Sequence, residues 1–551
     1  MRPHKFSKLI STLLGDTRKD SLDGLANTLC HGNKKELATR INTFFNSVSS
    51  DLPKITTLHD QRQITPPHHY TISVDDMEKK LAHLNIHKAS GPDGIPNWVL
   101  RDFCSILAAP AAAIANTSLR QRLVPPMWKE ADVCAVPKVS QPKSIETDLR
   151  PISLTPVLSK VTEDFIYGWI LDIIIPKLHW NQFGALKGSS TVDALVFLLH
   201  KMYTATDELG TFCRVLLIDY MKAFDRLDHC IVITKLTLLG VPSILVEWIT
   251  SFLHDRKQQV KVGSEISDWL CMSGGVPQGT KCGLLLFVCM INDLQPSDPI
   301  LTIKFVDDTT LLEIIKSKTK EPHPSYMQFA FSEVRAWTER QNMKINPPKL
   351  KEMITNFSKH SPQVEPVHVD GSPVSQVTNA KLLGVTISHD LKWDIHVKNI
   401  TRSASSRLYY LIVLKRCRAP TDHLLKIYLQ RIRPVLEYAC QSWHPGLTKD
   451  QTRTIEHVQK RALSIIFPKL TYTDALKTAN LTSLEARRQR LCQNYFEKLK
   501  SPTHKLHSLL PRKRPESYDL RDKSMAYEPP KLRTLRARGS FINWALFNLQ
   551  K

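Results

Sequence analysis

The sequence predicts an α+β fold whose C-terminal part is almost wholly helical. Short runs rich in Val, Ile and Leu alternate with longer segments of helical periodicity over the first two thirds of the chain. Past residue 390 the strand signals stop and helical candidates follow one another. A chain in which a few strands mix with helices and are then followed by helices alone is typical of α+β architecture.

The N-terminal elements are predicted to be helices joined by connectors. Residues 37–48 have helical spacing and precede a Pro- and His-rich linker. Ser73 is expected to cap an amphipathic helix within 71–88, which a glycine- and proline-rich turn then ends. We therefore separate a helical lead-in with its linker, 1–70, from an N-terminal extension, 71–117.

The middle of the chain alternates strand and helix signals. Residues 132–138 and 214–220 are typical of buried strands, and Ser190 is placed to cap a helix between them. Residues 301–315 predict a hairpin, which we expect to form one small antiparallel sheet with a strand at 381–387. The helices predicted around these strands span residues 156–175, 241–254 and 325–342.

The last third of the chain predicts helices, at residues 394–416, 421–440, 449–466 and 482–500. Lys and Arg recur along these helices. The stretch that follows them is basic and interrupted by prolines, so we expect the C-terminal region to be partly disordered or to follow a nucleic acid.

The composition indicates a folded protein with a polyanionic partner. The 551 residues include 75 Lys and Arg against 52 Asp and Glu, a net charge of +23. This surplus favours nucleic acid as a partner, although a merely solubilising surface would also be basic. The 11 dispersed cysteines, the lack of a signal peptide and the short apolar stretches predict an intracellular protein, cytoplasmic or nuclear, without a membrane partner.

Three aspartates require an explanation. Asp219 closes an apolar strand, and Asp307 and Asp308 stand side by side in the predicted hairpin. A tight turn would explain the adjacent pair without any function. Two carboxylates about 4 Å apart, however, repel by about 4 kcal/mol at an effective dielectric near 20. A divalent cation removes that repulsion, so the three acids are predicted to converge on a pair of Mg²⁺ or Mn²⁺ ions, as in two-metal phosphoryl transfer.

Seven motifs in a fixed order carry a resemblance to a known family. They are VPK (136–138) with DLRPISLTPVLSKVTEDFI (148–166), NQFGALKGSSTVDAL (181–195), LIDYMKAFD (217–225), GVPQGTKCGLLLFVCMINDL (275–294), FVDD (305–308), QNMKINPPKLKEM (341–353) and NAKLLGVTISHDLKW (379–393). In this order the chain resembles the reverse transcriptase of non-LTR, LINE-type retrotransposons, and most nearly that of the jockey-like elements.

The resemblance implies a right-hand polymerase. Fingers and palm with a small antiparallel sheet would occupy 118–388, a helical thumb 389–470, and a basic helical region 471–551. Because the fingers begin close to Met1, we expect the endonuclease domain that the family carries upstream to be absent from this chain.

The resemblance also assigns roles to individual residues. Asp219 and Asp307 would bind the metal ions, with Asp308 as a supporting acid. Phe224 would exclude a ribose 2′-hydroxyl, although ordinary core packing is the alternative. The residues that would contact the nucleotide or the template base are Gln278, Gly279, Arg150 and Lys187, and Lys349 would give a proton to pyrophosphate; each of the cations could instead be a solvated surface charge.

The activity that the resemblance implies is RNA-directed DNA synthesis. The enzyme would add dNMP from dNTP substrates to a DNA primer on an RNA template and would hold the RNA–DNA hybrid with its basic helices. The alternative is a catalytically inactive relic that only binds nucleic acid. Ala185 and Leu186, in place of the usual Phe and Arg, favour the relic, and so do Thr280 and Leu284, which replace the usual Ser and Pro of the glycine-rich motif. The three retained acids oppose it. A polymerase that makes RNA would need a small residue in place of Phe224.

Overall fold

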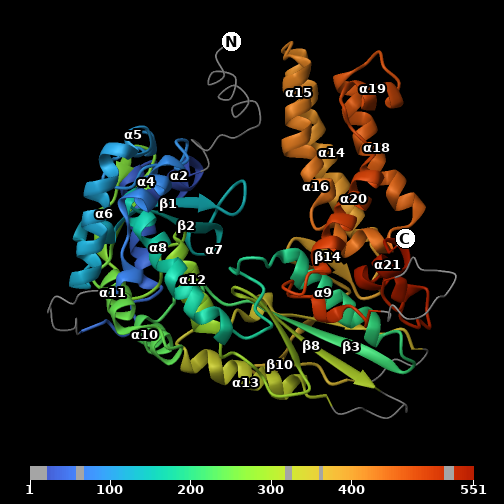
Figure 1. Cartoon of the computed structure of the whole chain (residues 1–551), viewed down its shortest axis with the longest axis horizontal. Helices are drawn as coiled ribbons and strands as arrows, with labels where there is room; N and C mark the ends of the chain where they lie inside the picture. The colour runs from blue at the N-terminus through green and yellow to red at the C-terminus, as the bar shows by residue number, and fades with distance from the viewer. Residues whose placement is uncertain (1–21, 57–66, 317–324, 359–363, 514–525, 551) are drawn as a thin grey trace.

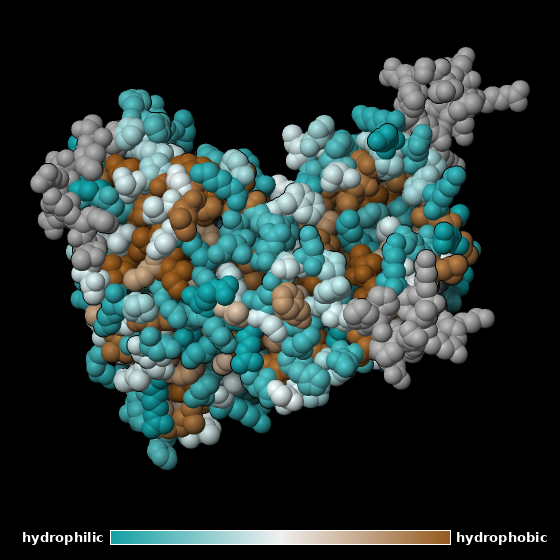
Figure 2. Space-filling view, turned by 90° about the horizontal axis from the view of Figure 1, so that it is seen from below, coloured by the Kyte–Doolittle hydropathy of each residue, from teal (hydrophilic) through white to brown (hydrophobic). Residues whose placement is uncertain are grey.

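The protein has two lobes that rise from opposite ends of a central sheet. The computed structural model describes residues 22–56, 67–316, 325–358, 364–513 and 526–550. Helices α2 to α8 together with α10 and α11 form one lobe, and helices α14 to α20 form the other. Strands β3 and β8 lie below the second lobe, and α9 lies between them and that lobe (Figure 1). Seen from below, a largely hydrophilic surface is indented between the two lobes (Figure 2).

The N-terminal lobe surrounds a small sheet with helices. Its sheet has β1 as a central strand, antiparallel to β2 and parallel to β4. The strands are β1 (Glu130–Pro137), β2 (Leu149–Leu154), β4 (Lys257–Val262), β5 (Glu265–Ile266) and β6 (Leu270–Cys271). The helices are α2 (Asp23–Cys30), α3 (Lys34–Ser47), α4 (Val74–Ala82), α5 (Asn97–Asp102), α6 (Cys104–Gln121), α7 (Ile145–Asp148), α8 (Val157–Ile174), α10 (His229–Leu238), α11 (Ser243–Leu253) and α12 (Lys281–Ile291).

The central sheet has the strand order β12-β9-β3-β8-β7. Its strands are β3 (Thr211–Ile218), β7 (Leu301–Phe305), β8 (Asp308–Lys316), β9 (Lys351–Thr355) and β12 (Ser375–Gln376), with helices α9 (Thr191–Ala205) and α13 (Met327–Arg340) nearby. As the sequence predicts, residues 301–315 form an antiparallel hairpin, and β3 pairs with β8 beside it. The predicted caps are also present, since Ser73 accepts a hydrogen bond at the start of α4 and Ser190 does so at the start of α9.

A buried ion pair joins two strands of this sheet. Arg214 on β3 and Glu352 on β9 are 1% and 0% exposed and form a salt bridge. Arg214 also donates hydrogen bonds to Ser325 Oγ at 2.7 Å and to the Glu365 carbonyl at 2.6 Å. The guanidinium is therefore well partnered, and Glu352 is the buried carboxylate that pairs with it directly. A second buried carboxylate, Glu313, accepts a hydrogen bond from Ser325 Oγ at 2.7 Å.

The C-terminal lobe is a helical bundle, and its core includes α9 as well. The helices are α14 (Asp394–Arg416), α15 (Thr421–Ile427), α16 (Arg433–Glu437), α17 (Cys440–Trp443), α18 (Lys449–Ile466), α19 (Tyr472–Thr478), α20 (Leu484–Leu499) and α21 (Phe541–Asn548). Buried residues of α9 belong to the same hydrophobic cluster as those of α14, α18 and α20. No helix in the described ranges has the length and apolar character needed to cross a bilayer.

Two predictions of secondary structure are wrong. The strand near 381–387 does not join the central sheet; residues 379–388 form a separate two-stranded hairpin, β13 (Asn379–Leu382) with β14 (Val385–Ser388). The helix expected over 421–440 is interrupted by a π-helical turn, Tyr428–Ile432, and ends at Glu437. Pro434, which has no N–H to donate, follows the wide turn and explains the break.

The described part of the basic C-terminal stretch is folded. Asp207, two residues after α9, accepts hydrogen bonds at 2.8 Å from the backbone N–H groups of Arg533 and Thr534. Phe541 and Ile542 on α21 are buried against α9 and α20. Residues 514–525 of the stretch expected to be partly disordered lie outside the described residues.

Candidate active site

The adjacent aspartates lie in a tight hairpin turn that is also the centre of an acidic cluster. Phe305 pairs with Asp308, so Val306 and Asp307 form a two-residue loop between β7 and β8. Val306 has a φ of +59°, in the left-handed region that such turns favour. The turn expected from local sequence is therefore present, and it presents Asp307 at its tip.

The register of the sheet brings the third acid to the same place. On β3, Ile218 pairs with Thr309 of β8, so the next residue, Asp219, comes opposite Asp308. Asn346 Nδ2 donates a hydrogen bond to Asp219 Oδ2 at 2.9 Å, and Lys349 Nζ lies 3.2 Å from the same oxygen. The three predicted acids thus gather at the end of two paired strands.

The acids interact electrostatically. Burial, followed by the charges of Asp307 and Asp219, raises the pKa of Asp308 to about 6. Burial and the charge of Asp219 also raise the pKa of Asp307. Asp308 is open to solvent on one side, so the rise reflects desolvation by the surrounding protein on its other sides together with repulsion from its neighbours.

The residues present fit a divalent cation held jointly with a substrate. Within the described ranges, no group of three or more His, Cys, Asp or Glu side chains already has the spacing of a complete metal site. Mg²⁺, however, takes one or two carboxylates and completes its shell with water and substrate phosphates. Crowded carboxylates whose pKa values are raised are stabilised when a cation binds beside them, which supports the predicted use of Mg²⁺ or Mn²⁺.

We expect cation binding at this cluster to depend on pH. Because a ligating carboxyl must lose its proton, the apparent affinity for Mn²⁺ should fall by up to about tenfold per pH unit below pH 6. The stability of the metal-free protein should depend on pH in the opposite direction. A carboxyl whose folded-state pKa is raised destabilises the fold when it is charged, so stability should increase as the pH falls from about 6 towards 4.

Manganese titrations followed by electron paramagnetic resonance at pH 5.0 to 7.5 measure the first effect. Asp308→Asn is the control, and its affinity should vary less steeply with pH. An affinity that is constant across this range would contradict the clustering of the acids.

One basic side chain of the N-terminal lobe acts on the acids directly, and two more lie close by. Arg150 on β2 is exposed, and its charge acts on Asp307. Lys138 and Lys222 were not predicted as site residues from the sequence. Burial and the nearby positive charges of Lys349 and Arg150 lower the pKa of Lys138, and burial lowers that of Lys222. Both interact electrostatically with Asp225 and Lys349. They belong to the motifs VPK and LIDYMKAFD, and this is the sequence signal that could have identified them.

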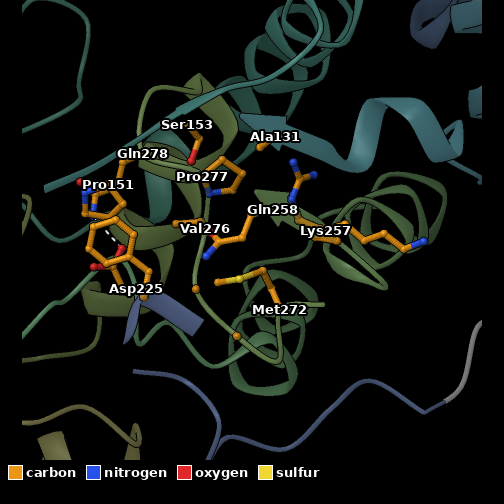
Figure 3. A pocket seen from close by; sticks show the side chains of 14 residues that line it. Ala131, Pro151, Ser153, Asp225, Lys257, Gln258, Met272, Val276, Pro277 and Gln278 are labelled. Carbon is orange, nitrogen blue, oxygen red and sulfur yellow. Dashed lines mark hydrogen bonds between the residues drawn. The ribbon is translucent and has the colours of Figure 1, made fainter. Parts of the chain in front are cut away.

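The glycine-rich loop after β6 folds against the end of motif LIDYMKAFD. Gln278 Nε2 donates a hydrogen bond to Asp225 Oδ1 at 2.7 Å, and the Gln278 carbonyl accepts one from Ser153 N at 3.0 Å. Gly279 has a φ of +122°, which disfavours any other residue. Figure 3 shows Asp225 and Gln278 side by side at one end of a small pocket whose wall includes Ser153, Val276 and Gln258. Burial raises the pKa of Asp225 to about 6.

The remaining predicted site residues differ in their relation to the acids. Phe224 is half-buried and stacks on Phe287, with 4.8 Å between ring centroids, while its carbonyl accepts a hydrogen bond from Val276 N at 2.9 Å. Lys349 contacts Asp219 directly. Lys187 is exposed on the loop before α9, and no described contact joins it to the acids. The structure therefore brings together Asp219, Asp307, Asp308, Arg150 and Lys349, places Phe224, Gln278 and Gly279 in contacting loops, and leaves Lys187 apart.

Comparison with known proteins relates the region that contains the acids to a known family. Residues 136–387 match the sequence model of the family described as reverse transcriptase (RNA-dependent DNA polymerase). These residues form a reverse transcriptase domain. The match begins at the end of β1, includes the glycine-rich loop and all three acids, and ends in the β13–β14 hairpin.

The similarity to curated relatives extends beyond the reverse transcriptase domain. The chain is 28% identical over 457 residues to a probable RNA-directed DNA polymerase from transposon BS, and 29% identical over 396 residues to one from transposon X-element, both of Drosophila melanogaster. It is 26% identical over 452 residues to the RNA-directed DNA polymerase from mobile element jockey of the same organism.

These alignments confirm the resemblance to the jockey-like elements. They cover 80%, 69% and 78% of this chain, and 49%, 42% and 48% of the respective relatives. The chain therefore spans about half the length of the curated relatives it matches.

Proposed function

We propose that this chain is an RNA-directed DNA polymerase of a non-LTR retrotransposon, which adds dNMP to the 3′-hydroxyl of a DNA primer on an RNA template. The observation that carries the proposal is the convergence of Asp219, Asp307 and Asp308 at the ends of paired strands within a reverse transcriptase domain. The named activity of the relatives supports it.

The proposed roles follow from position and charge. Asp219, Asp307 and Asp308 would hold divalent cations, which when bound activate the primer hydroxyl and balance charge on the pyrophosphate. Arg150, on β2 of the N-terminal lobe, would orient the triphosphate of the incoming nucleotide. Lys349, exposed and already beside Asp219, would neutralise or protonate the leaving group. Lys138 would add to this positive rim.

The architecture supports a right-hand arrangement of the polymerase. The N-terminal lobe with β1, β2 and β4 would be the fingers, the central sheet with the acids the palm, and the bundle beginning at α14 the thumb. Helices of this bundle carry many exposed Lys and Arg side chains. They would hold the phosphates of the RNA–DNA hybrid in a sequence-independent and salt-sensitive way.

Primer extension with labelled dTTP on poly(rA)·oligo(dT) tests the proposal. Addition of nucleotides that requires Mg²⁺ or Mn²⁺ is the expected result. Salt-dependent binding of the hybrid without any extension would instead identify the chain as an inactive nucleic-acid-binding relic.

Phe224 is proposed to select deoxyribonucleotides. Phe224→Ala should open space beside the ribose and increase the use of UTP relative to dTTP by about ten- to a hundredfold, measured as the ratio of the two kcat/KM values. Phe287→Leu, which disturbs the same aromatic stack from the buried side, is the matched control and should leave the ratio unchanged. An unchanged ratio in Phe224→Ala would assign Phe224 to core packing alone.

A further inference from the structure

The turn that carries Asp307 has an unfavourable backbone conformation. Val306 is β-branched, and its φ of +59° lies in a region where such residues are rare. Its side chain is buried, with 8% of its surface exposed. Strained residues of this kind persist only where neighbouring groups hold them, so the contacts of Val306 show what fixes the position of Asp307.

A glutamine from a distant motif makes the decisive contact. Gln182 is fully buried, and its Oε1 accepts hydrogen bonds from Val306 N–H at 3.1 Å and Gly184 N–H at 2.9 Å. Both lone pairs of this amide oxygen therefore accept hydrogen bonds, one from the turn and one from the loop that carries Gln182 itself. Because the Val306 N–H is in the left-handed turn, the bond is available only while the turn keeps that conformation.

The segment around Gln182 lies along β7 like a short extra strand. Gln182 forms a parallel bridge with Lys304. The Lys304 N–H donates to the Asn181 carbonyl at 2.9 Å, and the Phe183 N–H donates to the Lys304 carbonyl at 2.8 Å. These backbone bonds fix the distance between Gln182 and the turn two residues beyond Lys304.

Gly184 permits this close approach. A Cβ added at Gly184 would lie 2.5 Å from Val306 Cγ2 and 2.6 Å from Val306 N. Such a contact would push the turn away from Gln182, so the loop and the turn fit together only with glycine at this position.

Both partners in this contact are anchored to other parts of the protein. Lys304 Nζ donates to the carbonyls of Ile291, Asn292 and Leu294 at 2.9, 2.9 and 3.0 Å, which ties β7 to the end of α12. On the other side, Lys505 Nζ donates to the Gln182 carbonyl and lies 4.6 Å from the centre of the Phe183 ring. Lys505 follows α20, far outside the matched domain 136–387.

We propose that Gln182 is a positioning residue that holds the Val306–Asp307 turn, and that Lys505 supports it from the C-terminal region. The consequence for cation binding rests on the proposed function, because it takes Asp307 to be a metal ligand. The contact between Gln182 and the turn stands on the geometry alone.

Gln182→Leu is the central experiment, because leucine fills similar space but accepts no hydrogen bond. The Val306 amide should then exchange with deuterium at least about tenfold faster in a peptide covering the turn. Affinity for Mn²⁺, measured by electron paramagnetic resonance, should fall about tenfold. In primer extension, kcat should fall while the KM for dTTP changes little, since the nucleotide pocket is intact.

Restoring a relaxed turn should restore function. Glycine adopts positive φ without strain, so Val306→Gly placed in the Gln182→Leu protein should recover most of the Mn²⁺ affinity and kcat. A residue of purely structural importance would not be rescued at this one position. Lys505→Met should also weaken Mn²⁺ binding, but by less than Gln182→Leu does. If the Gln182→Leu protein does not fold, Lys505→Met and the double variant Gln182→Leu/Val306→Gly provide the test instead.

The matched control is Gln459→Leu. Gln459 is another buried glutamine, which bonds Tyr472 and the Thr482 carbonyl in the C-terminal lobe. Its loss should lower the melting temperature without changing exchange at Val306 or Mn²⁺ affinity.

The outcomes separate this inference from the proposed function. A folded Gln182→Leu protein with wild-type exchange and wild-type Mn²⁺ affinity would overturn the inference and leave the polymerase assignment intact. A wild-type protein that binds Mn²⁺ but extends no primer would overturn the proposed function, while faster exchange in Gln182→Leu would still support the positioning role.

Discussion

Asp307→Asn is expected to reduce primer extension by at least about a thousandfold. Asparagine keeps the size of the side chain but removes the negative charge that would hold the cations, and metal-ion catalysis contributes several kcal/mol to such transfers. The stability of the folded protein should not decrease. Since the charges of Asp219 and Asp307 both raise the pKa of Asp308, removing one of them lessens the repulsion. The metal-free variant should therefore melt at the same temperature as the wild type or higher.

The combination of lost activity and retained stability distinguishes a metal ligand from a structural residue. Asp102→Asn is the matched control, because Asp102 is an exposed acid at the end of α5 that pairs with Arg101, and its activity should be unchanged. Extension by Asp307→Asn at the wild-type rate would contradict the assignment of Asp307 as a metal ligand.

The largest effect on stability is expected from Glu352→Ala. This change leaves the guanidinium of Arg214 buried without its carboxylate, and breaking a buried pair in this way costs about 3–5 kcal/mol. Pulse proteolysis in urea measures the loss. Because β9 pairs with β3, the strand that carries Asp219 at its end, we also expect the site to lose order before the C-terminal lobe does.

Two further variants isolate the ion pair. Lys351→Ala, at the exposed neighbouring position on the same strand, should change stability by less than about 0.5 kcal/mol. The double variant Arg214→Met/Glu352→Leu should regain much of the loss, because an apolar pair of similar volume carries no buried charge. A single Glu352→Ala variant as stable as Lys351→Ala would show that Arg214 does not depend on this carboxylate.

The sequence by itself determined the local elements and the identity of the acids. An apolar, strand-like run interrupted by two turn-favouring aspartates predicted the hairpin of β7 and β8. The cap residues Ser73 and Ser190 marked the starts of α4 and α9. The adjacent charges of Asp307 and Asp308 indicated a site because their repulsion is local and large. These features depend on neighbours within a few residues, which is why pattern and order were sufficient.

Only the tertiary structure decided what surrounds the acids. Gln182 and Val306 are 124 residues apart, and Lys505 lies 323 residues from the carbonyl it binds. No local signal distinguishes a glutamine that will accept a hydrogen bond from a distant turn from one exposed to solvent. The strand β9, with its buried Glu352, was missed for the same reason, because its stability comes from pairing with β3 and from Arg214. Such contacts exist only once the chain has folded, since their energy comes from desolvated groups meeting across the sheet.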